Sequence, residues 1–206
     1  MTFSLPKIYP ITDVSITNLS HLEQTKRLVA GGAKIIQLRE KTASPAEFYE
    51  AAQAVMLFAR KRNVKIIIND RVDIALAVGA DGVHLGQNDL PPDQARKILG
   101  EKAIIGFSTH NIEQALEAVR LPINYLAIGP IFATNTKENP DTIVGIEGLS
   151  KVREAIGDFP LVAIGGINFE NARDILANGA DSIAVISAIL KPASDISENI
   201  NQFIKH

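Results

Sequence analysis

The segment "VKIIINDRVDIALAVGADGVHLGQND", residues 64–89, contains the repeating unit from which this chain is built. It starts with an apolar run of strand length (64–68) and continues through a polar step into a helix that begins near Arg71. A glycine then leads directly into a second apolar run, 81–85. Near-continuous hydrophobicity is typical of strands that are buried on both faces of a parallel sheet. The segment therefore predicts a strand–helix–strand unit.

Units of the same kind occur along the rest of the chain. Six further apolar runs of strand length lie at 7–12, 34–38, 103–107, 124–129, 161–165 and 182–186. Helix-like segments with signals for their starts or ends lie at 44–62, 111–119 and 168–179. A glycine that ends a helix and leads into the next strand recurs in the phrases GGAKII, VGADGV and NGADSI. Strands and helices are therefore expected to alternate.

Eight such strands within 206 residues predict an α/β protein with a single (β/α)8 TIM barrel that spans residues 1–206. A doubly wound open sheet is the alternative architecture. We favour the barrel because eight units can be counted and because no split or shift in composition marks a linker between two domains.

The composition excludes several classes of function. The chain has no cysteine, and so no disulfide, thiolate metal site or cysteine nucleophile. A net charge of −2 gives no global reason to expect nucleic acid as a partner. The first residues do not resemble a signal peptide, and no apolar run approaches the roughly 18 residues of a membrane span. We expect a cytoplasmic protein that binds small molecules; the sequence leaves open whether it forms a homo-oligomer.

Polar side chains and glycines follow the predicted strands where each strand ends. In a barrel these carboxyl ends meet at one rim, which is where the active sites of such enzymes lie. The side chains that follow strands two to five are Gln37, Arg39, Lys41, Asn69, Asp70, His84, Asp89, Ser108, Thr109 and His110. The backbone groups that follow strands seven and eight belong to Gly165, Gly166, Ile186 and Ser187. Their shared rim is the strongest indication of a functional site.

Taken one at a time, these residues also suit ordinary structural roles. Asp70 could cap the helix that follows it, Asp89 could close a turn, and a histidine such as His84 on a strand is more often a core residue than a ligand. His110, next to a predicted helix start, suits a role in local structure. The functional interpretation depends on their common position at the ends of the strands.

A phosphate site is expected where strands seven and eight end. Gly165 and Gly166 can expose backbone N–H groups before a helix, and so can the segment that starts at Ile186. The N-termini of helices attract anions, and the loops after strands seven and eight form a recurring phosphate site in this barrel. We therefore expect one phosphate monoester at this side of the rim.

The other side of the rim combines cations with carboxylates. Its cations are Arg39, Lys41 and Lys137. Asp70 and Asp89 would repel a phosphate directly, which predicts a divalent cation between them and the anion. Mg²⁺ takes one or two carboxylates together with phosphate oxygens. Zinc fits less well, because no two histidines stand at the spacing of zinc ligands.

Seven motifs follow one another on successive strands, namely QLREK, INDRVDIA, DGVHLGQND, STH, GPIFATNTK, AIGGI and AVISAI. In this ordered set the chain resembles the thiamine phosphate synthase family along essentially its whole length. The resemblance implies a Mg²⁺-dependent transferase on a (β/α)8 barrel. Such an enzyme joins 4-amino-2-methyl-5-hydroxymethylpyrimidine diphosphate to 4-methyl-5-(2-phosphoethyl)thiazole and gives thiamine phosphate and pyrophosphate.

The resemblance also implies roles for single residues. Gln37 is expected to contact the pyrimidine, and His84 is expected to lie in the same pocket. The residues expected to bind the diphosphate are Arg39, Lys41, Asn69, Ser108 and Lys137, of which Arg39, Ser108 and Lys137 are expected to be catalytic. Asp70 and Asp89 are expected to bind Mg²⁺. The groups expected to face the thiazole phosphate are Thr134, Thr136 and the backbone amides of Gly166, Ile186 and Ser187.

The segment "AIGPIFATNTKENPDTIVG", residues 127–145, lacks the periodicity of a helix or a strand. Loops of this length in compact domains are usually functional or disordered. We expect the strand to end near Gly129, so that Thr134, Thr136 and Lys137 lie over the mouth of the barrel. The segment is predicted to act as a lid that is mobile when the site is empty and ordered when both substrates are bound.

Three other functions remain as alternatives. A related thiazole tautomerase shares the fold and the phosphate end but needs neither a diphosphate nor a metal. A barrel isomerase with one phosphate site would need a carboxylate or cysteine base. A non-catalytic barrel that binds phosphorylated thiamine precursors would use the same binding residues. The presence of Arg39 with Lys41, of Asn69 with Asp70, and of Asp89 favours the synthase over the tautomerase.

Overall fold

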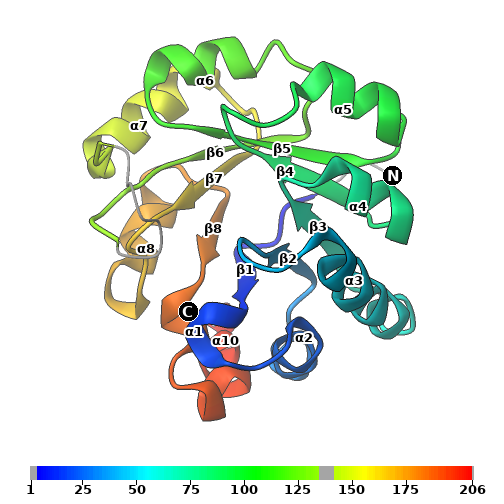
Figure 1. Cartoon of the computed structure of the whole chain (residues 1–206). Helices are drawn as coiled ribbons and strands as arrows, with labels where there is room; N and C mark the ends of the chain where they lie inside the picture. The colour runs from blue at the N-terminus through cyan, green and yellow to red at the C-terminus, as the bar shows by residue number, and fades with distance from the viewer. Residues whose placement is uncertain (1–3, 135–141, 206) are drawn as a thin grey trace.

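Eight parallel strands form a closed barrel in a computed structural model that describes residues 4–134 and 142–205. Each strand pairs with the next along the chain, and the first strand, β1, also pairs with the last, β8. The helices surround the strands as an outer layer (Figure 1). The predicted (β/α)8 barrel is confirmed, and the alternative of an open doubly wound sheet is wrong because β1 and β8 close the ring.

The strands span Ile8–Asp13 (β1), Ile35–Arg39 (β2), Lys65–Asn69 (β3), Gly82–Leu85 (β4), Ile104–Thr109 (β5), Tyr125–Ile128 (β6), Leu161–Ile164 (β7) and Ser182–Val185 (β8). The α-helices span Val14–Thr17 (α1), His21–Ala30 (α2), Pro45–Arg60 (α3), Val72–Val78 (α4), Pro92–Leu99 (α5), Ile112–Ala118 (α6), Gly145–Ile156 (α7), Phe169–Ala177 (α8), Ser187–Leu190 (α9) and Ile196–Lys205 (α10), and Ala193–Asp195 form a 3-10 turn. All eight predicted strands lie within two residues of the observed ones. None of these helices is long and apolar enough to cross a membrane.

Both faces of the strands are buried. Side chains that point inward fill the barrel, namely Tyr9, Ile11, Ile35, Ile67, Ile104, Tyr125, Ala127, Val162 and Ala184. Side chains that point outward pack against the helices in a larger cluster that includes Leu38, Ile68 and Leu126. This double burial explains why the strands read as near-continuous apolar runs. It also leaves most of the polar side chains to the ends of the strands.

The helix starts follow the predicted caps with one exception. The side chains of Asn111 and Asn168 accept hydrogen bonds from backbone N–H groups in the first turns of α6 and α8. Helix α4 begins after Arg71 without a side-chain cap. Asp70 therefore does not cap this helix, and its side chain contacts Lys41 instead. The structural role considered for Asp70 is wrong.

The Gly165–Gly166 pair after β7 occupies backbone conformations that other residues rarely adopt. Gly165 has φ +99° and Gly166 has φ +66°. A Cβ atom on Gly165 would lie 2.6 Å from Pro130, and one on Gly166 would lie 2.6 Å from Phe132. The backbone N–H of Phe132 donates to the carbonyl of Gly165 at 3.0 Å, so the segment after β6 packs directly on this turn. Glycine is required here both for backbone conformation and for space.

Replacing Gly166 with alanine should therefore cost more stability than replacing a glycine that is required only for its backbone conformation. Gly157, with φ +61°, is the matched control, because a Cβ atom added there would meet no heavy atom within 4 Å beyond its chain neighbours. Gly157 has ψ −132°, so its backbone conformation alone disfavours alanine. We expect Gly157→Ala to cost about 2 kcal/mol of unfolding free energy and Gly166→Ala about 4 kcal/mol, measured by urea denaturation. Equal losses would show that the contact with Phe132 carries no cost.

Candidate active site

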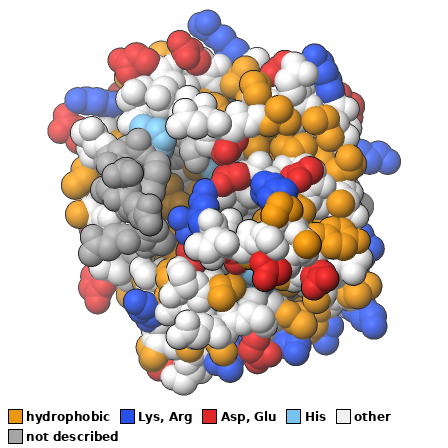
Figure 2. Space-filling view, viewed as in Figure 1, with side chains coloured by type: hydrophobic (Ala, Val, Ile, Leu, Met, Phe, Trp, Pro, Cys, Tyr) orange, Lys and Arg blue, Asp and Glu red, His pale blue; other side chains and the backbone are white. Residues whose placement is uncertain are grey.

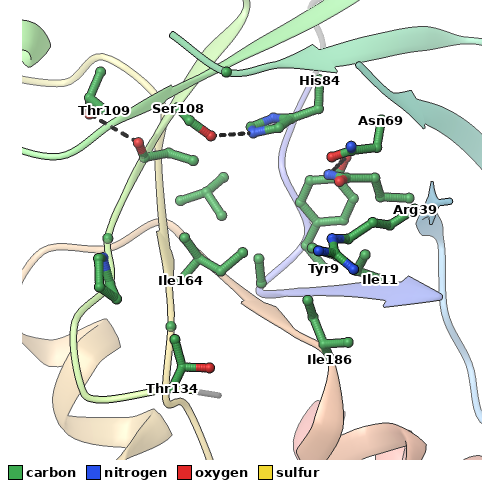
Figure 3. Close-up of a pocket in the computed structure, with 18 of the residues that line it drawn as sticks. Tyr9, Ile11, Arg39, Asn69, His84, Ser108, Thr109, Thr134, Ile164 and Ile186 are labelled. Atoms are coloured by element: carbon green, nitrogen blue, oxygen red, sulfur yellow. Dashed lines mark hydrogen bonds between the residues drawn. The ribbon is translucent and has the colours of Figure 1, made fainter. Parts of the chain in front are cut away.

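The carboxyl ends of the strands surround a pocket of about 490 Å³, part of whose lining is drawn in Figure 3. All eight strands or the segments directly after them contribute to its walls. The predicted site residues that line it are Gln37, Arg39, Lys41, Asn69, Asp70, His84, Asp89, Ser108, Thr134, Gly166, Ile186 and Ser187. Thr136 and Lys137 lie outside the described residues. The structure thus brings together every predicted site residue that it describes.

Two cations on one side of the pocket each lie beside a carboxylate. Arg39 contacts Asp13 at the end of β1, and Lys41 contacts Asp70 after β3. Figure 2 shows basic and acidic side chains next to one another near the centre of this face. Asp13 is almost fully buried and also accepts a hydrogen bond from the backbone N–H of Ser15 at 3.0 Å. Sequence reasoning missed Asp13, although its place directly after the predicted strand 7–12 was a signal of the same kind as for Asp70 and Asp89.

Asp70 and Asp89 form a pair of neighbouring carboxyl groups. Asp70 has φ +63°, a left-handed conformation that is uncommon for a residue other than glycine. Asp89 accepts a hydrogen bond from the backbone N–H of Gly86 at 2.7 Å, so it closes a turn as one structural interpretation predicted. Burial raises the pKa of Asp89, the Gly86 N–H lowers it, and the adjacent Asp70 raises it further.

This carboxylate pair fits a magnesium ion better than a transition metal. The described residues contain no cluster of three or more histidine, cysteine, aspartate or glutamate side chains that could form a complete metal cage. Mg²⁺ binds to one or two carboxylates and takes its other ligands from waters and phosphate oxygens. Burial is the main cause that raises the pKa of Asp89, and the neighbouring carboxylate of Asp70 adds to it, so a cation between the two would offset their repulsion.

A chain of hydrogen bonds crosses the floor of the pocket. It runs from the Gln37 side chain through the hydroxyls of Tyr9 and Tyr125 and the His84 ring to the hydroxyl of Ser108, with link distances of 3.2, 2.9, 3.0 and 2.9 Å. Figure 3 shows the last link, between His84 and Ser108. Gln37, His84 and Ser108 were predicted from the sequence, whereas the two tyrosines were not. Their hydroxyl groups connect Gln37 on one side of the pocket floor to His84 and Ser108 on the other.

Within this chain of hydrogen bonds, the imidazole ring of His84 is neutral. Burial lowers the pKa of His84 to about 4, an effect that the charge of Asp70 offsets in part. Burial also raises the pKa of Tyr125, so the hydroxyl beside Nδ1 stays protonated. A histidine of such low basicity, with a phenol instead of a carboxylate behind it, is a poor base for activating the Ser108 hydroxyl. The pair of Ser108 and His84 therefore suits hydrogen bonding to a ligand, not nucleophilic attack.

The opposite side of the pocket offers backbone groups. The turn at Gly166 leads to α8, and Ile186 precedes the short helix α9. The side-chain amide of Asn171 donates to the carbonyl of Gly166 at 3.0 Å and stabilises the turn. Figure 3 shows Thr134 on the other side of the pocket from Arg39. This side has the features expected of a site for one phosphate group.

A family model described as thiamine monophosphate synthase matches residues 8–189 of the chain. The chain belongs to the thiamine monophosphate synthase family. The thiamine-phosphate synthase of Clostridium novyi is 49% identical over 186 residues, which cover 90% of this chain and 91% of that protein. That of Chloroflexus aurantiacus is 44% identical over 197 residues, or 95% and 90% of the two chains. The family predicted from the sequence is confirmed.

A solved structure supports the same relationship. Thiamine phosphate pyrophosphorylase from Pyrococcus furiosus superposes with a TM-score of 0.86 at 40% sequence identity. The alignment covers 97% of this chain and 94% of that chain. The similarity therefore extends over the whole barrel, and includes the strand ends that form the pocket.

In this member of the thiamine monophosphate synthase family, two further polar residues contact the site. The Nδ1–H of His110 donates to the carbonyl of Gly129 at 2.7 Å, and His110 also lines the pocket. His110 therefore has the local contact that the sequence predicted, and it also faces the pocket. Gln87 donates from its side chain to the carbonyl of Ser108 at 2.5 Å. Its position in the motif GQND was the available signal for Gln87.

Backbone hydrogen bonds join the two ends of the segment after β6 to each other. The strand ends at Ile128, one residue before the predicted end. The backbone N–H of Val144 donates to the carbonyl of Pro130 at 2.8 Å, and that of Gly145 donates to the carbonyl of Ile131 at 3.2 Å. Residues 135–141 of the segment that is predicted to act as a lid lie outside the described residues. The lid role stays a prediction.

The low pKa of His84 predicts a dependence of stability on pH. An unfolded histidine titrates near 6.5, whereas His84 in the folded protein has a pKa of about 4. The unfolded state therefore binds a proton first as the pH falls, and stability is lost between about pH 6.5 and pH 4. Urea unfolding at about pH 7.5 and pH 5 should show a smaller loss in His84→Gln than in the wild type. A His84 imidazole that titrates between about pH 6 and 7 by NMR would contradict this.

Proposed function

We propose that this protein makes thiamine phosphate from 4-amino-2-methyl-5-hydroxymethylpyrimidine diphosphate and 4-methyl-5-(2-phosphoethyl)thiazole, with release of pyrophosphate. One observation carries the proposal, namely that one pocket has two sides of different construction, each suited to an anion. One side is built from cations and carboxylates, and the other from backbone groups at glycines and helix starts. Membership of the thiamine monophosphate synthase family supports it. The predicted cytoplasmic location is part of the proposal.

The side with Arg39 and Lys41 suits the diphosphate. Both cations line the pocket, and each is balanced by one carboxylate. Asn69 adds a donor, because its buried Nδ2 has no hydrogen-bond partner among the described residues. A buried donor without a partner costs free energy until a ligand supplies an acceptor. Phosphate oxygens, or a ring nitrogen of the pyrimidine, would satisfy it.

The pocket also has apolar walls. They are formed by Ile11, Ala127, Val162, Ile164 and Ala184. Walls of this kind suit flat aromatic rings. The hydrogen-bonding chain from Gln37 to Ser108 lies at the bottom of this space and offers polar contacts to the pyrimidine. The opposite end, with Thr134 and the amides of Gly166, Ile186 and Ser187, receives the thiazole phosphate.

Asp70 and Asp89 are the residues that would hold Mg²⁺. When bound, the ion supplies positive charge that stabilises diphosphate as a leaving group. The chain's own cations Arg39, Lys41 and Lys137 contribute to the same end by contacting the diphosphate oxygens. Such fixed charges favour the transition state when negative charge develops on the leaving group.

The reaction needs no protein nucleophile. The C–O bond between the pyrimidine methylene and the diphosphate breaks, and both electrons leave with the diphosphate. The ring amino group stabilises the resulting cation, which the thiazole nitrogen attacks to form the new C–N bond. The protein holds the two rings in line and shields the cation from water with the apolar walls.

A direct assay tests the function. The protein is incubated with both substrates, with and without Mg²⁺, and pyrophosphate and thiamine phosphate are measured. We expect both products to form in equal amounts and only with Mg²⁺. Binding of both substrates without turnover would favour the non-catalytic barrel. Binding of the thiazole phosphate alone would favour a tautomerase.

Lys137 tests the role of the loop cations. Loss of one preorganised charge at the leaving group costs about 10²–10³ in turnover, so we expect a fall of this size in Lys137→Ala. Lys151→Ala is the control, because Lys151 is exposed on α7 and pairs with Glu147 on the same helix. Near wild-type turnover of Lys137→Ala would rule out the role assigned to Lys137.

A further inference from the structure

Glu40 lies between Arg39 and Lys41 but faces away from the pocket. Arg39 and Lys41 line the central pocket, whereas Glu40 lines a separate outer hollow together with residues of α2 and α3. Successive side chains of an extended segment point to opposite sides, which explains the alternation. Any effect of Glu40 on the site therefore passes through the two residues beside it.

One oxygen of the Glu40 carboxylate is surrounded by donors of its own loop. Oε1 accepts hydrogen bonds from the backbone N–H groups of Lys41, Thr42 and Ala43 at 2.8, 2.8 and 3.1 Å. The hydroxyl of Thr42 donates to the same oxygen at 3.0 Å. Successive N–H groups that converge on one anion form a compact anion-binding turn. Here the anion belongs to the chain itself and fixes the conformation of the turn.

The other oxygen connects the turn to the body of the barrel. Oε2 lies 3.3 Å from Nε2 of His21, a side chain that is only 2% exposed. Nδ1 of His21 lies 2.7 Å from the hydroxyl of Thr12 in β1. Burial favours the neutral ring by lowering the pKa of His21. Nε2–H then donates to Glu40, and Nδ1 accepts from Thr12, so the turn is fastened to β1 through buried groups.

Threonine, histidine and glutamate in this order resemble a nucleophilic triad, but the surroundings exclude that role. Thr12 is fully buried, so no substrate can reach its hydroxyl. Burial alone would raise the pKa of Glu40, but hydrogen bonds from Thr42, Ala43 and His21 outweigh it and lower the pKa to about 2. The carboxylate thus keeps its charge and its contacts at any ordinary pH.

We propose that Glu40 is a positioning residue for the diphosphate end of the pocket. Its carboxylate folds residues 41–43 into one conformation and fastens them to His21, so that Arg39 and Lys41 enter the pocket together. The inference depends on the proposed function, which assigns the diphosphate to these two cations. Without Glu40 the turn would have to be ordered when the diphosphate binds, and that ordering would weaken binding.

The main test compares Glu40→Ala with the wild type in three measurements. These are KM for the pyrimidine diphosphate, KM for the thiazole phosphate, and the calorimetric Kd of inorganic pyrophosphate with Mg²⁺. We expect KM for the pyrimidine diphosphate and Kd for pyrophosphate to rise about tenfold, as for the loss of several backbone hydrogen bonds. KM for the thiazole phosphate should change by less than about twofold, because its site lies across the pocket.

Glu40→Gln should restore most of the lost affinity. Its amide oxygen can accept the same N–H groups of the turn, and its amide nitrogen can donate to Nε2 of His21. His21 would then carry its proton on Nδ1 and donate to Thr12, whose hydroxyl already lies 3.3 Å from the carbonyl of Gln37. Both constants should stay within about threefold of the wild type.

Glu47→Gln is the control for the change in charge. Glu47 lines the same outer hollow, and its carboxylate accepts a hydrogen bond from the backbone N–H of Ser44 at the start of α3, outside the turn of residues 41–43. All three constants should be unchanged in this variant. If Glu40→Ala does not fold, Glu40→Asp replaces it, because the shorter carboxylate cannot span the turn and His21 together. A rise of about threefold in the diphosphate constants is then expected.

Unchanged diphosphate constants in Glu40→Ala, or in Glu40→Asp where it is used, would overturn the positioning role. A similar rise of both KM values would also overturn it, since that pattern indicates general loss of structure. Failure of the wild type to release pyrophosphate would instead overturn the proposed function. In that case the pyrophosphate Kd still decides whether Glu40 positions the two cations. A wild type that does not bind pyrophosphate would exclude both the proposed function and the positioning role of Glu40.

Discussion

The pairing of β1 with β8 is the contact on which the rest of the structure depends. Ile8, Tyr9 and Pro10 lie in register with Ile183, Ala184 and Val185, and this pairing turns a row of parallel strands into a ring. A ring has no unpaired edge, so strands that are apolar on both faces can be buried completely. It also brings all the carboxyl ends to one rim. The two sides of the pocket face each other only because the ring is closed.

The strands could be predicted from the sequence because double burial leaves a simple pattern. Runs such as 64–68 and 161–165 contain few polar residues and are bounded by glycines and polar turns. The exact ends were less predictable, since strand β5 continues through Ser108 and Thr109, which read as the start of a loop. Backbone pairing with β6 extends the strand there, and side-chain polarity does not report such pairing.

The site was predictable where a residue's place relative to its strand end determines its surroundings, as for Arg39 and Asp89. It was not predictable where the decisive partner is distant in sequence. Tyr9 and Tyr125 read as core residues, and only the fold shows that their hydroxyls meet across 116 residues. Asp89 also shows that a turn role and a ligand role need not compete, since one carboxylate has oxygens and lone pairs for both.

The tyrosine pair beneath the pocket affects how ligands enter and leave the site. Tyr9 and Tyr125 are almost completely buried and, with Ile67 and Val162, close the barrel below the ligand space. The described residues thus leave the rim as the way in and out. A molecule seated deep against the floor has to enter before, and depart after, whatever lies above it. The depth of the pocket therefore restricts every ligand that touches the floor to one route, through the rim.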